Sequence, residues 1–204
     1  MRIVRLANFV GPQSGGLRTA LRELGIGYRT AGHEAVLIIP GEHPGVEETA
    51  QGTVITVRAP VAPGLGGDYR ASFGRRELSR LLCELRPDRL EVSDQLTLRW
   101  LARWARRHRV PAVMIAHESL TRLFTLPVGV RYKAAWRNIV FRSRAFYHAA
   151  SWAATFLDRR SAREYDEVVA TTKWAASEFE AAGSQSACGR FAASQLRHCG
   201  CATG

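Results

Sequence analysis

The chain has 204 residues, of which 46% are hydrophobic, and it carries a formal net charge of +11. This composition is ordinary for a globular protein with one substantial core, and no run approaches the roughly 18 apolar residues of a membrane-spanning helix. The N-terminal stretch MRIVRLANFV has no cleavage pattern, which favours a first strand over a signal peptide and a cytoplasmic location.

The positive charge is almost entirely arginine, since Lys133 and Lys173 are the only lysines. A basic chain suits an acidic partner, such as a nucleic acid, an anionic membrane or a phosphorylated substrate. The codon bias of a GC-rich genome produces the same excess of arginine. Both interpretations of the charge stay open at this point.

Strand-like and helix-like segments alternate along the chain, because short β-branched runs are followed by apolar positions at helical spacing. The expected strands are 2–7, 35–40, 53–57, 88–92, 111–118 and 166–172, and the expected helices are 15–31, 70–86, 95–109, 130–164 (bent or broken) and 173–183. In the second helix Phe73 is expected to face inward. The alternation predicts an α/β fold, with a doubly wound, mostly parallel sheet and helices on both faces.

A ligand of such a sheet lies beyond the carboxyl ends of the strands, where the strand order reverses. This rule selects four loops, at residues 8–18, 40–45, 92–97 and 116–121.

The first of these loops lies in FVGPQSGGLRTAL, residues 9–21, which leads from a strand into a helix. Its glycines fit neither the dinucleotide pattern G-x-G-x-x-G nor the triphosphate pattern that ends in Gly-Lys-Ser/Thr. The loop still places Gly15 and Gly16 at a helix N-terminus, where free N–H groups and the helix dipole favour an anion. Arg18 in the first turn could add a charged donor. A tight turn with no ligand is the competing interpretation.

The second loop contains EVSDQ at 91–95. Ser93 or Asp94 could cap the following helix, and capping is the favoured role. Either side chain could instead bind a substrate hydroxyl, because both follow the end of a strand.

The third loop contains IAHES at 115–119, in which His117 and Glu118 end an apolar strand. A histidine in this place could donate a hydrogen bond to a sugar hydroxyl or a phosphate oxygen, or serve as a general base. A capping or packing role is the alternative.

Two stretches combine arginine with aromatic residues, at 99–109 and 131–160. A basic, aromatic helix can lie in an anionic membrane interface, although ordinary packing on the sheet is the simpler interpretation. A nucleic-acid binder without catalysis is a further alternative. No helix-turn-helix, zinc-finger or RNA-recognition motif accompanies the arginines, so nucleic acid is not expected as a partner.

Three stretches of the chain together resemble the N-terminal domain of a family 4 glycosyltransferase with the GT-B fold. They are MRIVRLANFVGPQSGGLRTALRELGIGYRTAGHEAVLIIPG, RPDRLEVSDQLTLRWLARWARRHRVPAVMIAHESL and RRSAREYDEVVATTKWAASEFEAAG. The resemblance covers residues 1 to about 183 and is greatest to actinobacterial α-mannosyltransferases that use GDP-mannose and act on phosphatidylinositol mannosides or related glycolipids.

The resemblance implies two Rossmann-like domains that face each other across a cleft, with this one on the acceptor side. Gly15 and Gly16, with Arg18 nearby, would approach the donor diphosphate, and His117 would contact the transferred sugar. Ser93, Asp94 and Glu118 would lie near a lipid-linked or polyol acceptor. It also implies retention of anomeric configuration, no metal, no cofactor beyond the sugar nucleotide, and peripheral contact with the inner face of the plasma membrane.

The last residues, 184–204, show no strand pattern and contain Cys188, Cys199 and Cys201. Their spacing lacks the second ligand pair of a zinc site and implies no disulfide framework. We expect an irregular tail that is read out of frame or truncated, and no donor-binding domain after it. A chain of this kind is expected to be inactive alone.

Overall fold

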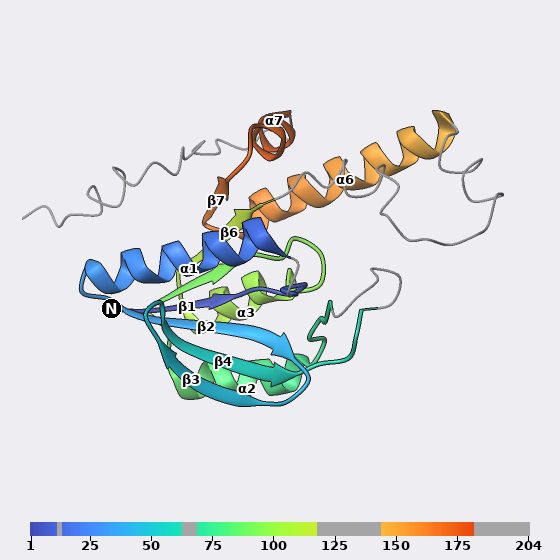
Figure 1. Ribbon diagram of the computed structural model, residues 1–204. Coiled ribbons are helices and arrows are strands. Elements are labelled where there is room, and N and C mark those ends of the chain that lie inside the picture. Colours follow the sequence, from blue (N-terminus) through green and yellow to red (C-terminus); the bar gives the residue numbers. More distant parts are fainter. Residues whose placement is uncertain (12–13, 63–68, 118–143, 182–204) are drawn as a thin grey trace, which may run out of the picture.

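The computed structural model of the chain describes residues 1–11, 14–62, 69–117 and 144–181. Seven strands form one sheet in the order β3-β4-β2-β1-β5-β6-β7 (Figure 1). The strands are β1 (Arg2–Leu6), β2 (Glu34–Gly41), β3 (Gly45–Thr49), β4 (Gly52–Arg58), β5 (Arg89–Val92), β6 (Ala112–Ala116) and β7 (Glu167–Ala170). The helices are α1 (Gly15–Thr30), α2 (Arg75–Leu85), α3 (Trp100–His108), α6 (Arg144–Glu164) and α7 (Lys173–Ala181). All strand pairs are parallel except β3 with β4.

The core lies on both faces of the sheet because successive strand residues point to opposite sides. Val4 and Leu6 of β1 belong to the larger apolar cluster, which includes Leu78 of α2 and Leu101 of α3. Helix α1 covers the opposite face, where its Leu21 packs with Ala7, directly after β1, and with Leu37 of β2 and Val54 of β4. The predicted doubly wound α/β sheet, with helices on both faces, is confirmed.

The α1 face also buries a charged network (Arg5, Glu91 and Tyr28). Arg5 of β1 is opposite Glu91 of β5 in the strand register, and both side chains are almost fully buried. The hydroxyl of Tyr28 donates to Glu91 Oε1 at 2.7 Å, and Arg5 donates to the carbonyl oxygen of Leu21 within α1. A Cβ on Gly25 would lie 2.6 Å from Arg5 Nη2, so glycine is needed where α1 crosses this arginine.

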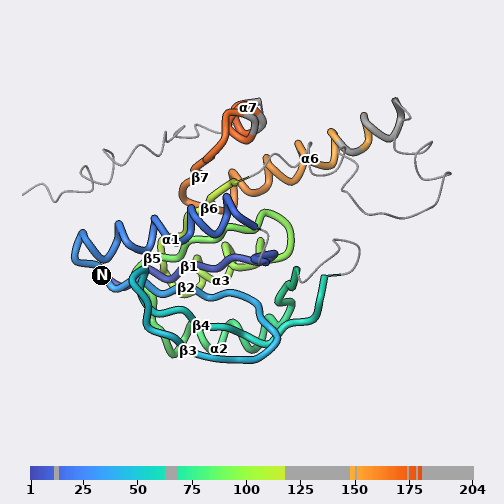
Figure 2. The backbone as a smooth tube through the Cα atoms, in the orientation of Figure 1, coloured from blue at the N-terminus to red at the C-terminus, as the bar shows by residue number. Residues whose placement is uncertain are grey.

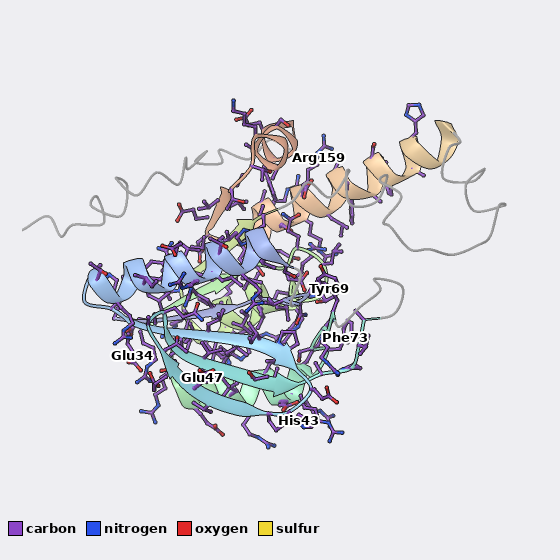
Figure 3. The ribbon with its side chains drawn as sticks, viewed as in Figure 1. Glu34, His43, Glu47, Tyr69, Phe73 and Arg159 are labelled. Atoms are coloured by element: carbon purple, nitrogen blue, oxygen red, sulfur yellow. The ribbon has the colours of Figure 1, made fainter. Side chains whose placement is uncertain are left out.

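Three details differ from the sequence expectations. Strand β3 was not predicted. Helix α2 begins at Arg75 rather than at residue 70, because residues 69–72 fold back toward the end of β4 and Arg70 forms an isolated antiparallel bridge with Val61. Phe73 therefore precedes the helix and is 56% exposed, so the prediction that it faces inward is wrong (Figure 3).

The third difference concerns α3, which begins at Trp100 rather than at residue 95. Within the predicted helical region 130–164, the structure describes only α6, from Arg144 onward. Residues 182–204, including the predicted irregular tail, lie outside the described residues. None of the helices described is long and apolar enough to cross a membrane.

The chain reverses its direction of travel across the sheet between β1 and β5. From β1 it proceeds through β2 toward β3 and β4 at one end, and later from β5 through β6 to β7 at the other. The carboxyl ends of β1, β5 and β6 therefore lie at neighbouring positions along one edge of the sheet (Figure 2). We call this edge the ligand edge, because open α/β sheets bind ligands where the strand order reverses.

Candidate active site

The N-terminus of α1 has no side-chain cap. Ser14 occupies the N-cap position, but its hydroxyl turns back into the loop. There it accepts a hydrogen bond from the N–H of Gly11 at 2.9 Å and donates to the carbonyl oxygen of Phe9 at 3.1 Å. The first N–H groups of the helix thus have no partner from the capping side chain. A helix start of this kind has donors and a positive dipole end available for an anion.

Gly15 and Gly16 are the first two residues of this helix, and nothing in the described part of the chain requires glycine at either position. A Cβ built on either would meet nothing within 4 Å, and neither residue has a positive φ. Glycine in a helix costs roughly 0.5–1 kcal/mol relative to alanine. The missing side chains therefore leave room for a group other than the described residues, which agrees with the expected close approach of a diphosphate. Arg18 is exposed in the same turn.

His117 follows the last residue of β6 at the ligand edge. Its Nε2 is buried and has no hydrogen-bond partner among the described residues. Burial lowers the pKa of His117 to about 4, so the imidazole is neutral at physiological pH. A neutral ring with an unpaired nitrogen can exchange a hydrogen bond with an incoming hydroxyl.

Ser93 follows the neighbouring strand, β5, and its backbone N–H donates to the carbonyl oxygen of Leu6 at 2.8 Å. Its hydroxyl oxygen is a second buried atom without a partner in the described part of the chain. Buried polar atoms without a described partner also occur within helices, at Trp104 of α3 and Ser161 of α6, so it is the place of Ser93 directly after a strand that distinguishes it. Ser93 and His117 end adjacent strands, so both unsatisfied groups belong to the ligand edge.

Asp94 is buried and has a defined structural role. Its Oδ1 accepts hydrogen bonds from the backbone N–H groups of Leu96 at 2.8 Å and Thr97 at 3.1 Å. This is a turn that precedes the helix, because the N-cap of α3 is Arg99 and lacks a side-chain hydrogen bond. The favoured expectation that Ser93 or Asp94 caps α3 is therefore wrong. Their predicted acceptor-side roles stay predictions, and Glu118 lies outside the described residues.

Sequence reasoning missed two polar residues at this edge, Asn8 and Thr171. Asn8 follows β1, is buried, and hydrogen-bonds with Ser72 and Asp94, 64 and 86 residues further along the chain. Thr171 follows β7, and its hydroxyl donates to the carbonyl oxygen of Ala116 at 3.3 Å. The only available signal was the position of each residue directly after a strand.

The residue after Asn8 has an unusual backbone. Phe9 has a φ of +59°, a conformation uncommon for residues other than glycine, and its N–H donates to the carbonyl oxygen of Arg70 at 3.0 Å. Nearby, the ring of Tyr69 packs against Gly11, where a Cβ would lie 3.1 Å from it (Figure 3). The loop that leads to α1 is thus held against the segment that precedes α2.

Comparison with known proteins identifies the family. The family model "Glycosyl transferase 4-like domain" matches residues 15–188. The GDP-mannose-dependent alpha-(1-6)-phosphatidylinositol dimannoside mannosyltransferases of two Mycobacterium tuberculosis strains are each 44% identical over 184 residues. These residues are 90% of this chain and 43% of each relative, so the chain spans less than half the length of the curated relatives it matches.

Solved structures show the same fold. Sucrose-phosphate synthase from Thermosynechococcus elongatus has a TM-score of 0.55 at 12% identity, over 91% of this chain and 46% of that one. HepE of Anabaena, solved in complex with UDP and glucose, has a TM-score of 0.51 at 18% identity, over 91% of this chain and 42% of that one. Because the family model matches residues 15–188 and the mycobacterial relatives are 44% identical over 90% of the chain, the chain belongs to the glycosyl transferase 4-like family.

Proposed function

We propose that this chain is the acceptor-side half of a retaining mannosyltransferase, which transfers mannose from GDP-mannose to a glycolipid such as a phosphatidylinositol mannoside. The family supports the class of reaction, and the names of the mycobacterial relatives support the donor and the type of acceptor. The observation that carries the proposal is the uncapped start of α1, where Gly15 and Gly16 leave open space at the ligand edge.

The chemistry assigned to α1 is stabilisation of the leaving group. As the bond between the sugar and the diphosphate breaks, negative charge grows on the phosphate oxygens. N–H groups and the positive end of the helix dipole stabilise such charge when they are already oriented toward it. The missing Cβ atoms of Gly15 and Gly16 let the phosphate oxygens approach these donors, and Arg18 adds a positive charge in the same turn.

The role assigned to His117 is contact with the transferred sugar, and that of Ser93 is contact with the acceptor. Both have a buried polar atom without a partner among the described residues, and both end neighbouring strands. A hydroxyl-rich substrate would satisfy these atoms. Because the imidazole is neutral, it can donate a hydrogen bond to a sugar hydroxyl without repelling a cationic, oxocarbenium-like sugar.

A fusion of residues 1–181 to the second half of the mycobacterial relative tests the proposal, with mannose transfer from GDP-mannose to phosphatidylinositol dimannoside as the assay. We expect transfer by the fusion and a loss of roughly 100-fold in kcat for His117→Ala, the size of effect typical of a positioned catalytic group.

Gly16→Val is expected to block donor binding in the fusion, since its side chain would occupy the space left for the diphosphate. Gly45→Val is the matched control, because Gly45 also has no atom within 4 Å of a built Cβ but lies at the start of β3. A folded fusion that transfers no sugar from GDP-mannose, or one indifferent to both His117→Ala and Gly16→Val, would overturn the proposal.

Peripheral contact with an anionic membrane is also proposed, on the evidence of α6. Trp152 is 72% exposed and Phe156 is 50% exposed, and their rings stack with centroids 5.8 Å apart. Arg159 (Figure 3) and Arg163 continue the same helical stripe and are exposed. The N-terminal part of α6 extends past the carboxyl ends of β2 and β4 (Figure 1). An interfacial helix presents this combination of aromatic rings and arginines to anionic lipids.

Sedimentation of the chain with phosphatidylcholine vesicles, with and without phosphatidylglycerol, tests the membrane contact. We expect binding only with the anionic lipid, weakened by salt and by Trp152→Ala with Phe156→Ala. Phe73→Ala is the matched control, because Phe73 is an exposed aromatic residue outside α6. Loss of binding only in the control would place the contact elsewhere. Binding to duplex DNA instead of vesicles would favour the nucleic-acid alternative.

A further inference from the structure

We propose that Asn8 is a positioning residue that joins three loops of the ligand edge into one acceptor platform. The platform comprises residues 8–9, 70–72 and 93–97. This inference rests on the proposed function for the identity of the acceptor, and on the hydrogen bonds of Asn8 for the coupling between the loops.

The side-chain amide of Asn8 reaches two loops from a third. Its Oδ1 accepts a hydrogen bond from the backbone N–H of Ser72 at 3.0 Å. Its Nδ2 lies 3.2 Å from the carbonyl oxygen of Ser72, 3.2 Å from Asp94 Oδ2 and 2.6 Å from Thr97 Oγ1. An amide offers one acceptor group and two N–H donors, so this one side chain can engage both loops at once.

The contacts of Asn8 are shielded from water. Asn8, Ser72 and Asp94 are 3%, 6% and 5% exposed. A buried polar group that loses its partner leaves that partner unsatisfied, which costs more than the net strength of the hydrogen bond. The three loops are therefore coupled, and a change at residue 8 affects both the segment before α2 and the segment after β5.

The platform contains one buried hydroxyl without a described partner and one residue with an unusual backbone. Ser93, with its unsatisfied hydroxyl, immediately precedes the Asp94 turn, and Phe9, with its positive φ, immediately follows Asn8. Strained backbone persists only where the surrounding structure holds it, and such strain concentrates at functional sites. Asn8 thus fixes the start of the glycine loop relative to Ser93, so that acceptor and donor groups keep a constant separation.

A swap of the two polar partners provides a specific test. Asn8→Asp alone would place two buried carboxylates face to face and break the platform. Asn8→Asp combined with Asp94→Asn restores a donor opposite an acceptor. In the double variant, the carboxylate at position 8 can still accept a hydrogen bond from the N–H of Ser72. The amide oxygen at position 94 can still accept from the N–H groups of Leu96 and Thr97. The Thr97 hydroxyl can donate to position 8 and accept from position 94, the reverse of its direction in the wild type.

Two measurements on the whole chain compare these variants with the wild type. The first is amide hydrogen exchange at Ser72, Leu96 and Thr97. The second is the Kd for deacylated phosphatidylinositol dimannoside, measured by NMR titration. We expect Asn8→Ala and Asn8→Asp to accelerate exchange at all three amides and to raise the Kd by about tenfold or more, as displaced binding groups do. The double variant should recover part of both, because the carbonyl oxygen of Ser72 has no donor at position 8.

Tyr28→Phe is the control for a general loss of stability. It removes a buried hydrogen bond to Glu91 on the other side of the sheet, toward the C-terminal end of α1. It should leave the Kd within about twofold, since distant sites act independently.

Exchange that rises only at Ser72 would overturn the coupling of the loops. A Kd that Asn8→Ala leaves unchanged would overturn the positioning role while the proposed acceptor stands. A wild-type chain that does not bind the probe, despite coupled exchange, would instead overturn the acceptor assignment and with it the acceptor platform.

Discussion

The loops after β1 and β5 lie side by side at the point where the strand order reverses, yet they use their polar groups in opposite ways. After β5, Asp94 accepts hydrogen bonds from the N–H groups of the next turn. After β1, Ser14 turns away from α1 and leaves the first N–H groups of the helix without a side-chain cap. The loop after β5 satisfies the N–H groups of its own turn with Asp94, whereas the loop after β1 has donors in place for a partner that the described chain does not supply.

The largest expected effect on stability comes from Asp94→Ala, in the loop after β5. The change removes a buried carboxylate that serves two backbone N–H groups and the side chains of Asn8 and Thr97. We expect the free energy of unfolding to fall by about 3 kcal/mol, as for other broken buried networks. Urea denaturation of the chain measures this loss. A loss below about 1 kcal/mol would show that the loop does not depend on Asp94.

The second effect depends on pH and comes from His117. Its pKa is about 4 in the folded chain, against 6.5 for an unburied histidine such as that of the unfolded chain. Between these values only the unfolded chain binds the proton, so stability falls as the pH falls from 6.5 toward 4. At about 1.4 kcal/mol per pKa unit, the loss between pH 7 and pH 5 is about 2 kcal/mol.

His117→Gln isolates this contribution, because the other histidines are the same in both proteins. We expect the stability of the wild type to fall more steeply with acid than that of the variant, as urea unfolding at the two pH values would show. Parallel pH profiles would mean that the imidazole is already hydrated in the folded chain.

A smaller loss of stability is expected from a change at the start of α7, which, unlike α1, has a side-chain cap. The Oγ1 of Thr172 accepts a hydrogen bond from the N–H of Ala175 at 3.1 Å at the start of α7. Thr172→Ala should lower the free energy of unfolding by about 1 kcal/mol, and Thr172→Ser should restore most of it. The same denaturation experiment measures both. A Thr172→Ala variant as stable as the wild type would show that this hydroxyl does not cap α7.

The smallest expected effect on stability is a gain rather than a loss, and it comes from Gly16→Ala. Gly16→Ala should stabilise the chain by about 0.5 kcal/mol or more, because alanine favours the helix and a Cβ here meets nothing within 4 Å. The same change should weaken GDP binding, followed by amide shifts in an NMR titration. Gly45→Ala should leave GDP binding unchanged. Gain of stability with no loss of binding would remove the argument that this glycine serves a ligand.

Much of the fold could be predicted from the sequence because the parallel strands are buried on both faces. Runs such as AVLIIP need no partner information to be recognised as strands. Strand β3 was missed for the opposite reason. Its residues GVEET are mostly exposed, so no apolar pattern marks them, and its pairing depends on the hairpin closed by Gly52, which has a φ of +108°.

The sequence indicated candidate site residues only where the signal lies within a single loop and its neighbouring strand or helix. Gly15, Gly16 and His117 stand out because each follows a recognisable strand or opens a recognisable helix. Asn8 also follows a strand, but its role depends on partners that are distant in sequence and meet it only after the sheet has formed. The predicted start of α3 was wrong for a related reason, because Asp94 directs the next N–H groups into a turn before the helix begins.

The two outer strands of the described sheet both carry exposed glutamates. Glu47 (Figure 3) and Glu48 lie on β3, where Glu48 accepts a hydrogen bond from Thr53, and Glu167 lies on β7 beside Arg89. A bare strand edge can recruit a strand from another molecule, and charged side chains on that edge oppose the pairing. In a chain with a net charge of +11, negative charge at both outer strands would keep neighbouring copies from joining their sheets into aggregates.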